Sequence, residues 1–177
     1  MKGFIKTHKK KLTLFLLIVI IINIIAIRIF DSPLKNKVCS SGITSFELAK
    51  DINTTKDILN SWDTNAKINM SLSLGFDFLF LLVYSSFIAL LIFNVNNRLW
   101  KNKPIYKLGK FLILLIFIAA FFDIIENIAL IRLLLGDLRQ IWASTAYYFA
   151  IIKFGIVLIT IIYLFINWLI LLFKKEV

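Results

Sequence analysis

Two carboxylates and a carboxamide stand inside a long apolar run of the chain. Asp123, Glu126 and Asn127 are flanked on both sides by phenylalanine, isoleucine, leucine and alanine. A helix turns about 100° per residue, so offsets of three and four place these side chains on one face. Ionisable groups at membrane depth are costly and commonly mark proton relays or binding sites. The sequence therefore predicts a buried acidic site here.

Two further apolar runs carry polar residues that could meet this face. Asp77 and Tyr84 are seven residues apart and share one face of their run, and Lys153 lies in the last run. Three carboxylates against one lysine cannot all stay ionised in a dry pocket, because like charges and desolvation both disfavour the charged form. We therefore expect protonation of one or two acids, or a bound cation, and a titration that belongs to the whole cluster.

The composition is that of an integral membrane protein. Of the 177 residues, 60% are hydrophobic, and they are gathered in runs long enough to cross a bilayer. The net charge is +11, but the basic residues flank these runs, which indicates contact with lipid headgroups rather than nucleic acid. Cys39 is the only cysteine, and the only histidine, His8, lies in the basic N-terminal tail. We therefore expect no internal disulfide, no metal site, no cofactor and no histidine-based catalysis in the membrane.

Four apolar runs define the expected architecture. The predicted fold class is an all-α membrane protein, a four-transmembrane-helix up-down bundle with a short helical extracytoplasmic cap between helices 1 and 2. The chain is expected to form a single integral membrane domain. Its parts are transmembrane helices at residues 12–30, 72–94, 111–135 and 144–173, the extracytoplasmic segment 31–70 and the cytoplasmic loop 95–110.

The polar segment 31–70 is expected to hold two short helices lying on the membrane surface. Thr44-Ser45-Phe46-Glu47 has the spacing of a capping box, and a second helical turn should end near Trp62. We expect Trp62 at headgroup level, because tryptophan concentrates at membrane interfaces. The segment could then act as a lid over the acidic site.

The charge distribution predicts the orientation. The N-terminal tail, the 95–110 loop and the C-terminus hold twelve of the 21 lysines and arginines (five, five and two). The 31–70 segment instead balances five lysines against five acids. By the positive-inside rule, both termini should lie in the cytoplasm.

This orientation converts sequence position into depth. At about 1.5 Å per residue, Asp77 should lie roughly 8 Å, Lys153 roughly 13 Å, and Asp123 and Glu126 roughly 13–18 Å below the outer ends of their helices. The expected site is a pocket in the outer half of the membrane, closed toward the cytoplasm by the apolar residues 111–122. A height difference of about 10 Å argues against an Asp77–Asp123 proton-sharing pair, and Glu126 is the better-matched partner of Asp77.

Short motifs follow one another in a set order over roughly residues 42–160. They are Ser45-Phe46-Glu47-Leu48-Ala49, Ile58-Leu59-x-Ser61-Trp62, Ser73-Leu74-Gly75-Phe76-Asp77-Phe78-Leu79-Phe80 with Tyr84, Asp123-x-x-Glu126-Asn127 and Lys153-Phe154. This pattern resembles a family of uncharacterised bacterial integral membrane proteins with no assigned activity. The resemblance implies a bacterial cytoplasmic membrane as the location, and it implies that Glu47 and Trp62 belong to the same unit as the intramembrane acids.

Four functions remain open for this site, three of which are given first. The polar residues could serve only to fix helix packing, although hydrogen bonds between spans average only about 0.6 kcal/mol. They could form an enzyme in which Asp77, Asp123 and Glu126 are the candidate catalytic acids and bases. They could move protons or ions, which would need a polar path past the apolar inner half of the third span.

The interpretation we favour is a site for a lipid or small amphiphile of the outer leaflet. The expected ligand-binding residues are Glu47, Asp77, Tyr84, Asp123, Glu126, Asn127 and Lys153. Lys153 could meet an anionic headgroup, or the acids a cationic one. The expected partners are membrane lipids and not nucleic acid, and the sequence leaves a homo-oligomer open.

Overall fold

The computed structural model describes residues 2–173, with side chains from Lys10 to Phe173. All the secondary structure elements of the described residues are helices, and four of these helices are long and apolar enough to cross a membrane. These are α1 (Lys2–Asp31), α4 (Thr64–Leu99), α5 (Ile105–Leu134) and α6 (Gln140–Phe173). The 3₁₀ turn η1 (Ser32–Leu34) and the short helices α2 (Ile43–Glu47) and α3 (Ile52–Ser61) join α1 to α4. The expected all-α bundle with a helical cap after its first long helix is confirmed.

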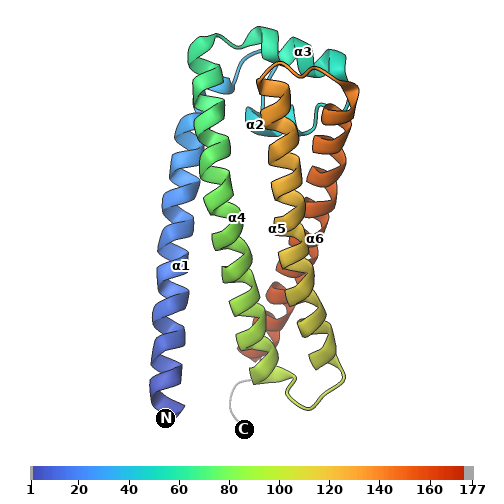
Figure 1. Cartoon of the computed structure of the whole chain (residues 1–177). Helices are drawn as coiled ribbons and strands as arrows, with labels where there is room; N and C mark the ends of the chain where they lie inside the picture. Colours follow the sequence, from blue (N-terminus) through green and yellow to red (C-terminus); the bar gives the residue numbers. More distant parts are fainter. Residues whose placement is uncertain (1, 174–177) are drawn as a thin grey trace.

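The long helices alternate in direction, as an up-down bundle requires (Figure 1). Helices α4, α5 and α6 pack closely on one another, whereas α1 lies at the side of the bundle along α4. Much of α1 is exposed, including the large apolar side chains of Phe15, Ile22 and Ile29. An apolar surface of this kind suits contact with lipid tails.

The helices extend beyond the apolar runs that predicted them. Helix α4 begins at Thr64 rather than at residue 72, because the Asp63 carboxylate caps it by accepting from the Ala66 amide at 2.7 Å. Its 36 residues span about 54 Å, against a hydrocarbon thickness of about 30 Å. The expected loop 95–110 is correspondingly reduced to the five residues between Leu99 and Ile105. The start of α4 is therefore marked by its cap and not by the beginning of the apolar run.

Part of the expected cytoplasmic surface falls outside what the structure describes. The side chains of Lys2, Lys6, His8 and Lys9 are not described, nor are Lys174 and Lys175. The basic residues of the turn between α4 and α5, including Lys101 and Lys103, lie at the end of the bundle opposite the cap (Figure 1).

The cap packs against the end of the bundle. Trp62 is 4% exposed, donates from Nε1 to the Leu34 carbonyl at 2.9 Å and packs its ring against Phe46. Trp62 is therefore enclosed by protein rather than exposed on the surface of the cap. These side chains join a buried cluster that includes Leu130 of α5 and Ala146 of α6, so the cap shares its core with the long helices.

Helix α2 is fixed by α1 rather than by its own capping box. Asp31, at the end of α1, accepts a hydrogen bond from the Ile43 amide at 2.6 Å. Gly42 precedes α2 with φ +59°, and a Cβ there would collide with the Asp31 side chain. The expected Thr44–Glu47 capping box does not form, because Thr44 lies within α2 and Glu47 is buried among the long helices.

A buried asparagine links three helices at the end of the bundle opposite the cap. The Asn96 side chain donates to the Tyr106 carbonyl at 2.9 Å and accepts from the Tyr163 hydroxyl at 3.3 Å, which joins α4, α5 and α6. Gly109 of α5 packs directly against Asn96, and a Cβ there would collide with its carboxamide. Glycine at this position permits the close approach of α4 and α5.

Replacing Gly109 with alanine should therefore weaken this junction. We expect Gly109→Ala to unfold at a lower temperature than Gly75→Ala, a matched control at an α4 position with open space around it. Both changes bring the same gain in helix propensity, so the difference reports the collision, about 1–3 kcal/mol. Thermal unfolding in detergent followed by circular dichroism measures it, and equal unfolding temperatures for the two variants would contradict the prediction.

Candidate functional site

Lys153 of α6 is at the centre of the buried charges. Its Nζ lies 2.6 Å from Asp123 Oδ1 and 2.8 Å from Glu126 Oε2, both on α5. Lys153 is 5% exposed and Glu126 is 0% exposed. The two acids are three residues apart on one helical face, so one ammonium group can contact both. The Asp123 contact is a directed hydrogen bond, while the Glu126 contact is an ion pair without one.

Helix α4 supplies two further polar groups to the same place. The Tyr84 hydroxyl donates to Asp123 Oδ2 at 3.2 Å, and Asp77 Oδ2 accepts from Asn127 Nδ2 at 2.6 Å. The structure therefore brings together all the intramembrane residues that the helical spacing selected. Three elements hold them: α4, α5 and α6.

Glu47 reaches this group from outside the membrane-spanning helices. It ends α2, is 7% exposed, and lies close enough to Lys153 and Asp123 for their charges to act on it. Burial raises the pKa of the Glu47 carboxyl above its ordinary value, and the Lys153 charge opposes this shift without cancelling it. The cap thus adds a fourth carboxyl to the three on α4 and α5.

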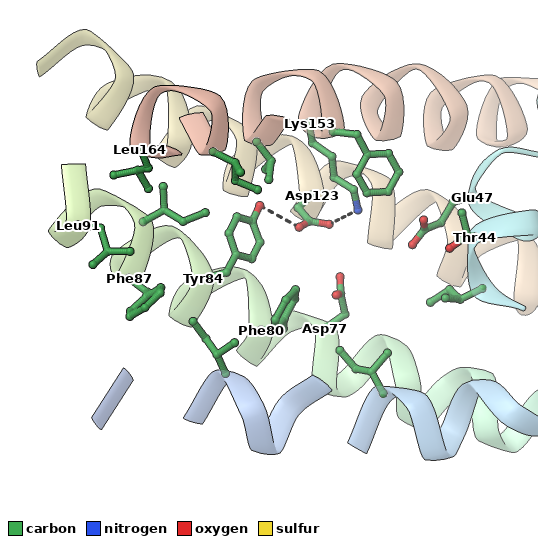
Figure 2. A pocket seen from close by; sticks show the side chains of 17 residues that line it. Thr44, Glu47, Asp77, Phe80, Tyr84, Phe87, Leu91, Asp123, Lys153 and Leu164 are labelled. Atoms are coloured by element: carbon green, nitrogen blue, oxygen red, sulfur yellow. Dashed lines mark hydrogen bonds and ion pairs between the residues drawn. The ribbon is translucent and has the colours of Figure 1, made fainter. Parts of the chain in front are cut away.

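A cavity of about 520 Å³ borders the charged groups. Its volume lies within the range typical of small-molecule sites, roughly 300–1,000 Å³. In Figure 2 the Glu47, Asp77, Asp123 and Lys153 side chains lie at the cap end, while Phe87, Leu91 and Leu164 lie at the other end. The cavity is therefore polar at one end and apolar along the rest of its length.

The side walls of the cavity come from helices on either side of α4. Ile20 and Ile27 of α1 line it on one side, and Phe154 and Ile161 of α6 line it on the other. Phe154 and Ile161 are also 43% and 49% exposed, so this wall borders the surface of the bundle. The cavity thus lies beside the bundle surface that would face lipid.

Asp77 is joined to the acidic face of α5 through Asn127. Its hydrogen bond to Asn127 puts it level with that residue, one helical turn or about 6 Å from Asp123. The expected Asp77–Glu126 pair is not formed, since Asp77 bonds Asn127 and Glu126 contacts Lys153. Asp77 and Asp123 line the cavity together.

Three polar side chains between the acidic group and the end of the bundle opposite the cap donate to carbonyls of their own helices. Ser85 donates to the Leu81 carbonyl, Thr160 to the Val157 carbonyl and Asn167 to the Tyr163 carbonyl, each at 2.7 Å. Asn167 Oδ1 also accepts from Trp100 Nε1, so this residue joins α6 to the end of α4 as well.

The apolar walls of the cavity carried no recognisable signal in the sequence. Phe80, Phe87, Leu91, Val157 and Leu164 resemble the other apolar residues of their spans. Only the packing of α4 against α6 and the position of α1 distinguish them from lipid-facing neighbours.

Because burial raises the Glu47 pKa, protein stability should depend on pH through this residue. Below the ordinary glutamate pKa of 4.5, the Glu47 carboxyl is neutral in both the folded and the unfolded protein. As pH rises from 4.5 through the raised pKa, the unfolded protein ionises this carboxyl more readily than the folded protein does, so the free energy of unfolding falls. We therefore expect Glu47→Gln to gain stability relative to wild type as pH rises above 4.5. Thermal unfolding across pH 4–8 measures the difference.

The matched control for this experiment is Asp57→Asn, which removes an exposed acid from α3. Its difference from wild type should stay constant where that of Glu47→Gln grows. A constant difference for Glu47→Gln as well would show that the carboxyl is not held in its neutral form.

Comparison with known proteins adds no relative from which a residue role could be transferred. No protein-family model, curated protein or solved structure matches the chain.

Proposed function

We propose that this membrane protein binds a lipid or small amphiphile of the outer leaflet in the cavity between α1, α4 and α6. The observation that carries the proposal is the two-part lining of the cavity: charged groups at the cap end and hydrocarbon side chains beyond them. An amphiphile has the same division between headgroup and chain.

The length of the cavity supports the same proposal. Along α4, its lining extends from Asp77 to Leu91, a rise of about 21 Å. The hydrocarbon region of one leaflet is about 15 Å deep, half of the bilayer core. An acyl or alkyl chain lying beside Tyr84 and Phe87 would thus have its headgroup near Glu47 and Asp77.

A purely structural role for the charges explains less of this arrangement. Lys153 with Asp123 and Glu126 is already a complete link between α5 and α6. Glu47 and Asp77 are not needed for that link, yet both border the cavity. Buried carboxyls are costly, and a cavity beside them removes packing that would otherwise offset the cost.

Filling the apolar part of the cavity should expel the ligand. We expect native mass spectrometry of the purified wild-type protein to show bound lipid or amphiphile, and Ile161→Trp to show little, because the indole would occupy the cavity. The control is Ile159→Trp, on the same helix and 54% exposed but outside the cavity lining. The absence of ligand from wild type, or equal retention by the two variants, would refute the proposal.

We also infer that the cap faces outward and both termini face the cytoplasm of a bacterial cell. The basic turn between α4 and α5 supports this orientation, because lysine and arginine concentrate in cytoplasmic loops. The cavity opens to the outer leaflet only in this orientation.

Cysteine labelling tests the orientation. Cys39 is fully buried, so it should be silent toward a membrane-impermeant maleimide. We expect Asp57→Cys, on α3, to be labelled in intact spheroplasts, and Lys101→Cys, in the α4–α5 turn, to be labelled only after permeabilisation. The reverse pattern would assign the cavity to the inner leaflet.

A further inference from the structure

We propose that the polar end of the cavity recognises a protonated amine carried on an apolar chain, with Glu47 and Asp77 as the groups that hold it. The inference rests on the proposed function and adds the chemical class of the headgroup. It follows from the charge balance around Lys153, from the two carboxyls that remain, and from the rings beside them.

Lys153 is already neutralised by residues of the protein. Its Nζ contacts Asp123 at 2.6 Å and Glu126 at 2.8 Å, and its side chain is only 7% exposed. An anionic headgroup would have to approach this ammonium group within a site that also holds Glu47 and Asp77. Like charges at short range disfavour that approach. A phosphate or carboxylate is therefore a poor fit to the polar end.

Two carboxyls of the site are left without a cation. Glu47 is more than nine-tenths buried, lines the cavity and forms no ion pair with a described residue. Asp77 uses Oδ2 to accept from Asn127, which leaves Oδ1 for the cavity. Buried acceptors of this kind require donors, and an ammonium group supplies three together with a positive charge.

Aromatic rings border the same end of the cavity. In Figure 2, Phe80 lies between Tyr84 and Asp77, and the Phe80 and Tyr84 ring centroids are 5.3 Å apart. The faces of such rings attract organic cations, most strongly where water is excluded. Carboxylates with flanking rings favour an alkylammonium group over a bare metal ion, and the described acids form no cluster of metal-ligand geometry.

Two sources could supply this chemistry: a free long-chain amine, or the ethanolamine headgroup of a phospholipid. Both present a primary ammonium group at the end of an apolar body. They differ in the adjacent phosphate, which the acidic surroundings of Lys153 disfavour.

The test uses three probes with the same chain: tetradecylamine, tetradecanol and tetradecanoate. Each is titrated into the protein in neutral detergent, and binding is read by native mass spectrometry. We expect the amine to bind at least about tenfold more tightly than the alcohol, since a charge-assisted hydrogen bond to a buried carboxylate is worth roughly this much. Tetradecanoate should bind most weakly.

The variants assign the preference to its residues. Asp77→Asn and Glu47→Gln should each reduce the amine-to-alcohol ratio by about tenfold, because they preserve shape and remove the carboxyl that can ionise beside a bound ammonium group. Asp57→Asn on the exposed surface of α3 should leave the ratio unchanged. Thermal unfolding verifies that each variant is folded, and the two site variants lie on separate elements, so loss of one to misfolding leaves the other informative.

The outcomes separate this inference from the function on which it rests. Equal binding of amine and alcohol, both abolished by Ile161→Trp, would overturn amine recognition while leaving an amphiphile site. Failure of all three probes, with no lipid retained by wild type, would overturn both. If the amine is preferred, titration with phosphatidylethanolamine and phosphatidylglycerol of matched chains identifies the source. Preference for the ethanolamine lipid indicates a phospholipid headgroup, and indifference between them indicates a free amine.

Discussion

The ion pairs of Lys153 set the constraint on which the rest of the structure depends. A lysine on α6 buried between two acids of α5 is tolerable only while both helices keep one register, because removing either partner leaves an uncompensated charge that costs about 3–5 kcal/mol. With α5 and α6 held in this way, Tyr84 and Asp77 of α4 bond to the same face of α5. The charged centre thus determines how the three inner helices meet.

The same centre determines the character of the cavity. Its lysine pairs with two of the four carboxyls, so the two carboxyls without a cation, Glu47 and Asp77, lie on the cavity side. The apolar lining begins within two turns of Asp77 and continues to the far end. One stretch of α4 therefore provides both a polar and an apolar part of the cavity lining.

Periodicity was sufficient to predict the parts of this structure that depend on one helix. The spacing of Asp123, Glu126 and Asn127 identified a face that the structure buries, and the apolar runs identified the four long helices. Features that depend on several elements escaped it. Trp62 is buried because α2 and the bundle surround it, and α4 begins at a cap on Asp63 that hydropathy does not register. The cavity walls depend on where α1 lies against α4.

Asp31 joins two roles that are usually separate. It ends α1, which forms a side wall of the cavity, and it holds the first amide of α2, the helix that carries Glu47. Gly42 packs directly against Asp31, whose side chain occupies the space that a Cβ at residue 42 would need. A transmembrane helix changes its tilt with the thickness of the surrounding bilayer. The wall and the acid at the cavity's polar end are thus joined, and a change in the tilt of α1 would move α2 and Glu47 with it.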